Sequence, residues 1–398
     1  MLNRRMFLGG CGVVAAAAGL GRWVGAREGE RLVERIDAGL ATGTRFLAER
    51  QAADGAWRSE IYGPFRDGPS LTSLIGATLV ELEEESGGRE ALEKAVTYLA
   101  QMVSADGRVR AGADGITYPV YTAAGAVIVL SRINGRVNAV ARDAWLTDLR
   151  QRQLAEELGW MPADTAYGGW SYAQDRPRPV DGKPATPLAA PNLSATVFAL
   201  EALCAAGCDA DDTAFQKALV FVKRCQNWND DESTRDPRLD DGGFYFIVDD
   251  PQRNKAGEAG KDAMGNVRYS SYGSATADGM RALTFCGVKG DQPRAAAARQ
   301  WLQAHFSAGE HPGQYAATRM HVRPAVFFYY CASVAQAFAE MAAPASWGKE
   351  LSRELLTRQR QDGSWSNPVV DVREDDPLVA TPMAMRALAA CRTRISPS

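Results

Sequence analysis

The sequence predicts an all-α protein that folds as a single α/α toroid, with six inner and six outer helices in one domain over residues 27–398. Three observations lead to this prediction. A ten-residue block recurs six times, a more amphipathic helical pattern follows most of its copies, and a turn signal built on Asp-Gly lies between an outer helix and the next inner one. A unit that recurs along the chain is the signature of a repeat architecture.

The recurring block is rich in small and apolar residues on nearly all sides, which is typical of a helix buried on most of its surface. Its copies read SLIGATLVEL (73–82), YTAAGAVIVL (121–130), SATVFALEAL (194–203), SATADGMRAL (274–283), YYCASVAQAF (329–338) and VATPMAMRAL (379–388). Proline suits a helix start and lies shortly before five of them, as Pro69, Pro119, Pro191, Pro324 and Pro377. We expect these six helices to form the inner barrel.

The segments that follow most blocks carry one apolar stripe and are charged elsewhere. They are 89–101, 213–225, 294–305 and 347–360. Such a helix packs one face inward and leaves the other in water. A closed ring accommodates both kinds of helix, with the amphipathic ones as an outer sleeve.

A turn motif accompanies the repeat. Gln51-Ala52-Ala53-Asp54-Gly55-Ala56-Trp57 has a near copy at Gln359-Arg360-Gln361-Asp362-Gly363-Ser364-Trp365. Weaker copies lie at 101–107, 167–170 and 240–244, and a degenerate one at 311–314. We expect Asp-Gly to turn the chain, Trp to pack on the neighbouring hairpin, and Gln to satisfy backbone groups at the helix end.

This motif resembles the QW repeat of squalene and oxidosqualene cyclases, shared in weaker form with protein prenyltransferase β-subunits. The resemblance covers residues 34–393 and implies a terpene cyclase-like toroid that binds or processes a hydrophobic, isoprenoid-like ligand in its centre. The chain has no Asp-x-Cys zinc motif of the prenyltransferases and only three histidines. Neither a metal nor another cofactor is expected.

The catalytic Asp-x-Asp-Asp run of the cyclases has a literal match at 209–212. That run follows inner block 194–203, so we expect it to cap the outer helix 213–225 instead. The segment that precedes block 379–388 carries Asp371, Glu374, Asp375 and Asp376. Asp376 is there either a catalytic acid or the N-cap of the next helix.

Block positions one, five and eight share one helix face. Position five contains an acid in one copy, Asp278, and position eight of the same block is Arg281. Buried charges must be paired, so Asp278 and Arg281 either form a structural ion pair or line the central cavity, Arg281 then as a ligand-binding residue. Asp278 is the first candidate for a functional carboxylate. As a structural pair, Asp278→Ala would strand a buried Arg281 and destabilise strongly.

Aromatic residues collect near the inner-helix starts, and the tyrosines among them are candidate ligand-binding residues. These are Tyr118, Tyr121, Tyr269, Tyr272, Tyr329 and Tyr330. Such rings stabilise carbocations in cyclases through cation–π attraction, and they also serve simply to fill the centre of a toroid.

Residues 1–26 resemble a twin-arginine export signal. Asn3-Arg4-Arg5-Met6-Phe7-Leu8 precedes a weakly apolar stretch, and Val24-Gly25-Ala26 offers a cleavage site. We expect the protein to be exported and to act in the periplasm or another extracytoplasmic space, with the signal either cleaved or kept as an anchor.

A net charge of −3 gives no nucleic-acid footprint. The resemblance to the cyclases implies a hydrophobic small molecule as the partner, and peripheral association with a membrane stays open. The sequence leaves open the oligomeric state and whether the protein is an enzyme. One alternative is a non-catalytic protein that binds a lipid, peptide or glycan. Another is a toroid polysaccharide lyase or hydrolase, for which Arg319 and His321 are the candidate residues.

Overall fold

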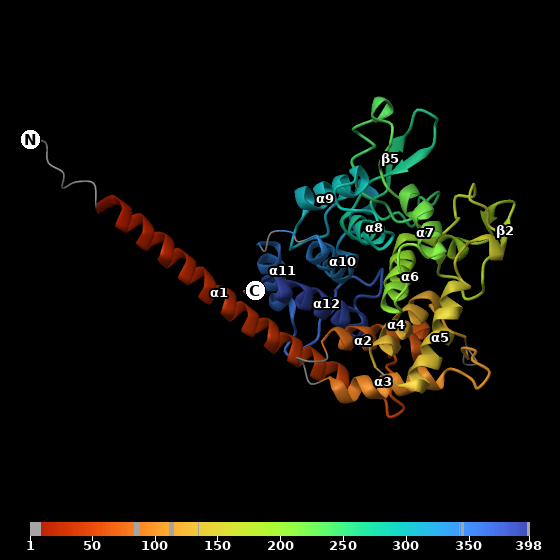
Figure 1. Cartoon of the computed structure of the whole chain (residues 1–398), viewed down its shortest axis with the longest axis horizontal. Helices are drawn as coiled ribbons and strands as arrows, with labels where there is room; N and C mark the ends of the chain where they lie inside the picture. The colour runs from red at the N-terminus through yellow and green to blue at the C-terminus, as the bar shows by residue number, and fades with distance from the viewer. Residues whose placement is uncertain are drawn as a thin grey trace, which may run out of the picture.

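The computed structural model describes residues 9–395 except 83–87, 111–114, 134, 342 and 344–345, with side chains from residue 27 onward. The paired arginines of the predicted export signal therefore lie outside the described residues. Twelve α-helices form the body of this described part. The predicted all-α toroid is confirmed (Figure 1).

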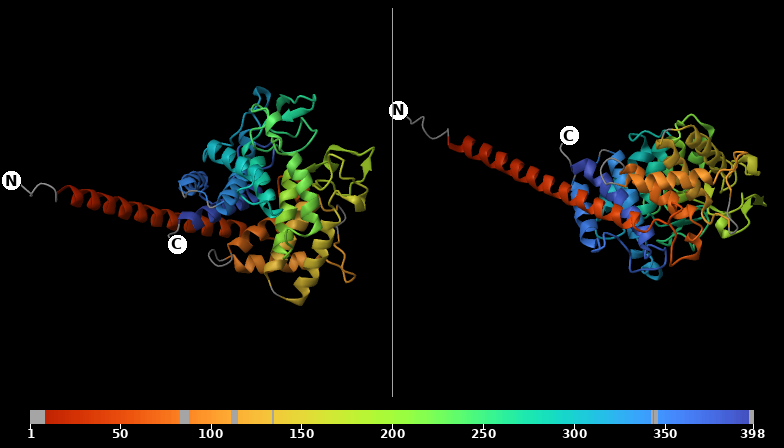
Figure 2. Two further views of the ribbon diagram at one scale, coloured as in Figure 1. Left: turned by 45° about the horizontal axis from the view of Figure 1, so that its top comes forward. Right: turned by 90° about the horizontal axis from the view of Figure 1, so that it is seen from below.

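The six inner helices close into a ring. Each recurring block lies in one of them, namely α2 (Pro69–Glu81), α4 (Pro119–Arg132), α6 (Leu193–Ala205), α8 (Gly273–Phe285), α10 (Phe327–Glu340) and α12 (Pro377–Ile395). Each packs against the next one in this order, and α12 packs back against α2. Figure 1 shows this circuit, and Figure 2 shows it from two other sides.

Small residues let the inner helices approach closely. A Cβ on Gly125 of α4 would lie 2.6 Å from the carbonyl oxygen of Ser73 in α2, so a larger residue would push the two helices apart. Eleven of the 13 residues of α2 are buried, against five of 13 in the neighbouring outer helix α3. This contrast is the one that the apolar blocks and the single stripes predict.

The outer helices are α1 (Gly9–Ala48), α3 (Arg89–Gln101), α5 (Arg136–Arg150), α7 (Thr213–Arg224), α9 (Pro293–His305) and α11 (Ser346–Arg358). Four of them match the predicted amphipathic segments. The remaining two, α1 and α5, are not predicted from the sequence pattern. The signal of α5 is weak because two of its four buried positions are alanines, Ala141 and Ala144. Among the described residues, no helix has the length and apolar character needed to cross a membrane.

Strand is confined to short antiparallel pairs in the connections that lead into inner helices. β1 (Trp170–Ser171) pairs with β4 (Pro191–Asn192), β2 (Pro179–Val180) with β3 (Lys183–Pro184), and β5 (Glu258–Lys261) with β6 (Val267–Tyr269). The connections also contain the 3₁₀ turns Gly63–Phe65, Glu156–Leu158, Pro187–Ala189, Glu232–Thr234, Ala317–Arg319 and Pro324–Val326. In Figure 1, β2 and β5 lie at the periphery, away from the centre of the ring.

The tryptophans of the turn motif make the same contact in each strong copy. The indole N–H of Trp57 donates to the carbonyl of Leu47 at 2.7 Å, and that of Trp365 donates to Leu355 at 2.7 Å. Both rings are fully buried. The indole therefore satisfies a carbonyl near the end of the preceding outer helix, where intrahelical donors run out.

The glutamines of the motif join consecutive outer helices. The Gln51 amide donates to Gly55 in its own turn and to Ala91 in the first turn of α3, at 2.9 and 2.8 Å. Gln153 and Gln226 repeat this pattern toward α7 and α9, and Gln359 reaches Gly39 of α1, which closes the sleeve. The sequence analysis missed Gln153 and Gln226 because long insertions separate them from the glycines that they contact.

Replacement of Gln226 by alanine should lower the free energy of unfolding by about 1–3 kcal/mol, because two carbonyls lose their donor in a site with little access to water. Gln101→Ala is the matched control. Gln101 is exposed at the end of α3 and makes none of these bonds to the described residues. Urea denaturation of both variants measures the difference, and equal effects would contradict the assigned role.

Candidate functional site: a central cavity

A cavity of about 400 Å³ occupies the centre of the inner ring. Block position one contributes a lining residue from all six inner helices, namely Ser73, Tyr121, Ser194, Ser274, Tyr329 and Val379. Position five contributes Ala77, Gly125, Phe198, Asp278 and Met383. Positions one and five, which share one helix face, therefore line the cavity, whereas position eight contributes only Ile128 and Arg386 among the described lining residues.

The cavity opens at the amino-terminal ends of the inner helices. Connecting segments that lead into these helices complete its wall there, through residues such as Phe65, Tyr172, Phe246 and Leu188. Leu188 is 59% exposed and lies at this opening. Tyr172 and Phe246 each lie two residues past the aromatic residue of a Gly-Gly turn, a signal that the sequence analysis did not use.

Aromatic rings dominate the wall. Tyr121 packs against Tyr172 and Phe198 at ring-centroid distances of 5.7 and 5.0 Å, and Phe198 stacks with Tyr329 at 6.5 Å. Tyr118 contacts the ring of Tyr121 at 6.4 Å. Of the predicted ligand-binding tyrosines, the structure therefore places Tyr118, Tyr121 and Tyr329 in the cavity wall.

The other three tyrosines do not line this cavity. Tyr330 follows Tyr329 on α10, so it points to another side of the helix, where its hydroxyl donates to the carbonyl of Ser307. Tyr272 packs edge-on against His311, and Tyr269 packs against Tyr245. These three rings fill space between elements, which is the second role considered for the aromatic group.

Asp278 is a buried carboxyl of the wall, with 1% of its surface exposed. The hydroxyl groups of Tyr329 and Ser333 donate to its two oxygens, each at 2.7 Å. Burial raises the pKa of Asp278 to about 6, although these two donors and the charge of Arg281 act in the opposite direction. Asp278 can therefore hold or release a proton near neutral pH.

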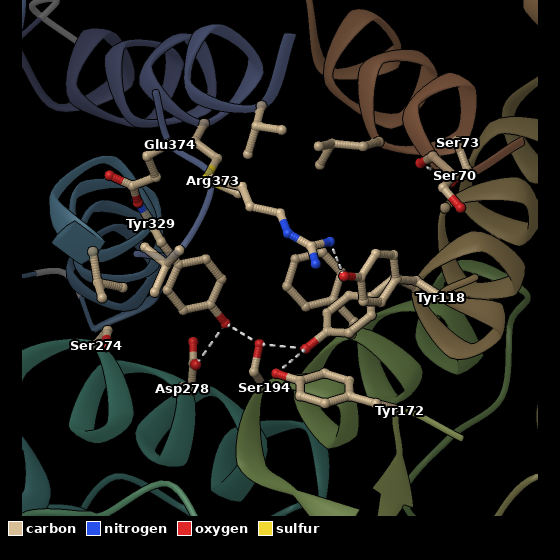
Figure 3. Close-up of a pocket in the computed structure, with 18 of the residues that line it drawn as sticks. Ser70, Ser73, Tyr118, Tyr172, Ser194, Ser274, Asp278, Tyr329, Arg373 and Glu374 are labelled. Atoms are coloured by element: carbon tan, nitrogen blue, oxygen red, sulfur yellow. Dashed lines mark hydrogen bonds between the residues drawn. The ribbon is translucent and has the colours of Figure 1, made fainter. Parts of the chain in front are cut away.

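A chain of hydroxyl groups runs from Asp278 along the wall (Figure 3). The Tyr329 hydroxyl lies 2.6 Å from that of Ser194, which accepts from the Tyr121 hydroxyl at 2.9 Å. The Tyr121 hydroxyl in turn lies 3.3 Å from that of Tyr172. The chain orients the carboxyl and satisfies the polar atoms of an otherwise apolar wall.

A cluster of charges closes the cavity at the carboxyl-terminal ends of the inner helices. Glu201 of α6 accepts from Arg281 of α8 at 2.9 Å and from Arg386 of α12 at 2.5 Å. Glu81 of α2 also pairs with Arg386, at 2.6 Å, and Glu340 of α10 lies 3.7 Å from Arg281. Burial alone would raise the pKa of Glu201, but the two guanidinium groups outweigh it and lower the pKa to about 2.

This cluster corrects the expected pair of Asp278 and Arg281. The closest carboxylate partner of Arg281 is Glu201, on the neighbouring inner helix, and Asp278 is held by hydroxyl groups. Arg281 does not line the cavity, and Asp278 does. Residues three apart on one helix share a face but differ in depth along it, so the two side chains reach different layers of the ring.

Two acidic residues of the segment before α12 accept hydrogen bonds from backbone N–H groups at the starts of helices. Asp376 accepts from the backbone N–H of Leu378 at 2.9 Å and from the hydroxyl of Ser59, so it is an N-cap of α12 and does not line the cavity. Glu374 does line it, but its carboxylate accepts from the backbone N–H groups of Phe328 and Tyr329 at the start of α10. Burial raises the pKa of Glu374 to about 7.

Two cations line the cavity near its opening. Arg373 has a left-handed backbone, with φ of 68°, and its guanidinium reaches the Tyr118 hydroxyl among the rings of Tyr62, Phe65 and Tyr118. The Lys255 ammonium lies 4.3 Å from the centroid of Phe246. No sequence signal marks either cation, because each is a single charge in a polar connecting segment.

Other sequence candidates lie elsewhere. Asp212 caps α7 by accepting from the N–H of Ala214 at 2.9 Å, which confirms the capping role predicted for the 209–212 run. Arg319 donates to the carbonyls of Pro251 and Gln252, His321 is exposed, and neither lines the cavity. Within the described residues, no group of three or more His, Cys, Asp or Glu side chains could hold a metal ion.

Fold and cavity together define an α/α-toroid protein with a central cavity. No model of a protein family matches the sequence, and no curated protein matches it. The type II terpene cyclase MstE from Scytonema has a similar structure, with a TM-score of 0.53 at 13% identity over 91% of this chain and 99% of that one.

Enzymes that act on sugars share the same toroid. A cellobiose 2-epimerase from Spirochaeta thermophila gives a TM-score of 0.58 at 12% identity over 91% of this chain and 97% of its own. An α-1,6-mannanase from Salegentibacter sp. gives 0.52 at 12% identity over 92% and 99%. At such identities the likeness shows the fold alone, and the function must be argued from the cavity.

Glu201→Gln should lower the free energy of unfolding by about 3 kcal/mol, because it leaves two buried guanidinium groups without their shared carboxylate. Glu340→Gln is the matched control. Its carboxylate is one-third exposed and 3.7 Å from Arg281, so its loss should cost less than about 1 kcal/mol. Guanidinium chloride denaturation distinguishes the two, and equal small losses would contradict the assigned role of Glu201.

Asp278 should make the protein less stable as the pH rises from 3.8 to about 6. The folded state holds the Asp278 proton to higher pH than the unfolded state, so the loss from this group is about 3 kcal/mol once the pH exceeds its folded pKa. Asp278→Asn removes this titration. Unfolding free energies of both proteins from about pH 4 to 7 should diverge in favour of the variant, and parallel curves would contradict the raised pKa.

Proposed function

We propose that the protein binds a hydrophobic, isoprenoid-like molecule in its central cavity. The observation that carries the proposal is the chemistry of the wall, where tyrosine and phenylalanine rings, with aliphatic residues such as Ile128 and Met383, surround the buried carboxyls of Asp278 and Glu374. A volume of about 400 Å³ is within the range of small-molecule sites, about 300–1,000 Å³.

The wall favours this ligand over a sugar. A sugar site needs many free polar groups, because each hydroxyl of the ligand must be satisfied when it leaves water. Here the hydroxyls of Tyr121, Ser194 and Tyr329 already bond to one another or to Asp278. The substrate complex of MstE contains geranylgeranyl dihydroxybenzoate, a molecule with an isoprenoid chain, in the same type of toroid.

Asp278 is the candidate acid of the cavity. Transfer of its proton to a ligand double bond would form a carbocation on the ligand and leave a carboxylate on Asp278. The neighbouring rings of Tyr121, Phe198 and Tyr329 would stabilise that cation by cation–π attraction, and loss of a proton from the ligand would end the reaction. The raised pKa of Asp278 keeps part of the population protonated near neutral pH.

We also propose that the toroid acts outside the cytoplasm, after export through the twin-arginine signal of residues 1–26. Support for this comes from the paired arginines Arg4 and Arg5, the apolar stretch after them and the small residues at 24–26.

Ala77→Phe should weaken the binding of farnesol by about tenfold or more, because the added ring occupies the cavity where the ligand chain would lie. Ala77 is buried in α2 and lines the cavity. Val140→Phe, on an exposed position of α5, is the matched control and should leave binding unchanged. Isothermal titration calorimetry measures both, with circular dichroism as a check on folding.

Cellobiose and α-1,6-mannobiose serve as the sugar arms of the same titration. Binding of either sugar without binding of farnesol would overturn the proposal. Incubation in D₂O followed by recovery of the ligand separates binding from turnover. The Asp278 carboxyl exchanges its proton for deuterium in D₂O, so turnover would place deuterium in a cyclised product.

A further inference from the structure

Three cations line the cavity, and ion pairs with described residues hold only one of them. That one is Arg386, which Glu81 and Glu201 neutralise at 2.6 and 2.5 Å. Arg373 and Lys255 have no carboxylate within ion-pair distance among the residues that the structure describes. A charge in an apolar cavity is costly unless it is paired, so these two cations favour an anionic group supplied by a ligand.

The two nearby carboxylates are committed elsewhere. Glu374, next to Arg373 in the chain, directs its oxygens to the backbone N–H groups at the start of α10, at 3.0 and 2.8 Å. Asp278 accepts from Tyr329 and Ser333. Figure 3 shows the Glu374 carboxylate on the Tyr329 side and the Arg373 guanidinium turned the other way, into the cavity toward Tyr118.

The backbone conformation and the side-chain contacts of Arg373 hold its guanidinium in one place. Its backbone has φ of 68°, in the left-handed region that non-glycine residues rarely adopt, and this conformation costs free energy that the surrounding structure must offset. The guanidinium lies 5.4–5.5 Å from the ring centroids of Tyr62, Phe65 and Tyr118, which hold it by cation–π attraction. Its hydrogen bond to the Tyr118 hydroxyl leaves further N–H groups for a ligand.

Lys255 adds a second positive charge to the wall. Burial lowers the pKa of Lys255 to about 8, while the negative charges of Asp278 and Glu374 partly oppose this change. An anion bound in the cavity would favour the charged ammonium further. It would also favour the protonated form of Asp278, the form that the proposed acid role requires.

We propose that the ligand of the cavity carries an anionic head group, a phosphate or a carboxylate, which binds Arg373 and is also favoured by the positive charge of Lys255 on the same wall. The apolar part of the ligand then extends past Tyr121 and Phe198 toward the closed end. Arginine suits this role because its planar guanidinium can form two parallel hydrogen bonds to such a head group. This inference rests on the proposed binding of an isoprenoid-like chain and deepens it.

The test compares ligands that share one chain, namely farnesol, farnesyl phosphate and farnesoic acid, by isothermal titration calorimetry on the wild-type protein. At least one of the two anionic ligands should bind about tenfold or more tightly than farnesol, because hydrogen bonds to charged groups are among the strong ones. Inorganic phosphate alone should bind far more weakly than farnesyl phosphate, since it lacks the chain.

Arg373→Gln should remove most of the preference for the anionic ligand over farnesol, because the charge-assisted hydrogen bond to the head group is lost. Arg373→Lys should keep part of the preference. Arg136→Gln, an exposed arginine at the start of α5, is the matched control and should change nothing. Lys255→Gln gives an independent second variant, and circular dichroism checks that each variant is folded.

Equal affinities of the wild-type protein for farnesol and both anionic ligands would overturn the inference while the proposed function stands. A preference that survives in both Arg373→Gln and Lys255→Gln would overturn it as well. Inorganic phosphate that binds as tightly as farnesyl phosphate would assign the site to a free anion instead. A wild-type protein that binds none of the three farnesyl ligands would overturn the proposed function and this inference together.

Discussion

Glu201 accepts hydrogen bonds from two buried guanidinium groups, and the closed end of the ring depends on this arrangement. With Glu81 and Glu340, the cluster draws charged side chains from five of the six inner helices. An apolar plug could fill the same space, but it would fix neither the rotation nor the depth of each helix as charges do, since each charge must meet its partner. The cavity above it therefore has a defined floor.

The wall above this floor leaves space for a cavity because block position five carries a small residue in three of its six copies, namely Ala77, Gly125 and Ser333. Gly125 lets α4 approach α2 to the limit that the backbone allows, and Ala77 leaves space beside it. Tyrosines at position one then bring rings and hydroxyls to the opening. The result is a cavity with ion pairs at its floor, a mostly apolar middle and the cations Arg373 and Lys255 near its opening, an arrangement that suits a chain with a polar end.

The toroid itself does not select the chemistry. MstE, the cellobiose 2-epimerase and the mannanase all share its architecture with this chain at 12–13% identity. The inner helices supply the same wall positions whatever residues occupy them, and the connecting segments supply the rest. Function in such a fold therefore depends on the side chains at positions one, five and eight and on loop residues such as Arg373 and Lys255.

The sequence by itself determined the toroid and its inner helices, because burial on all sides and burial on one stripe leave different periodic patterns. It also placed Asp278 on the helix face of block positions one, five and eight, and left open whether that face lines a cavity. Only the tertiary structure decided that Arg281 pairs with Glu201, that Tyr330 lies outside the cavity and that Arg373 reaches into it. Periodicity records which side of a helix is buried, whereas partners across the ring and the aim of a loop residue depend on contacts between segments far apart in the chain.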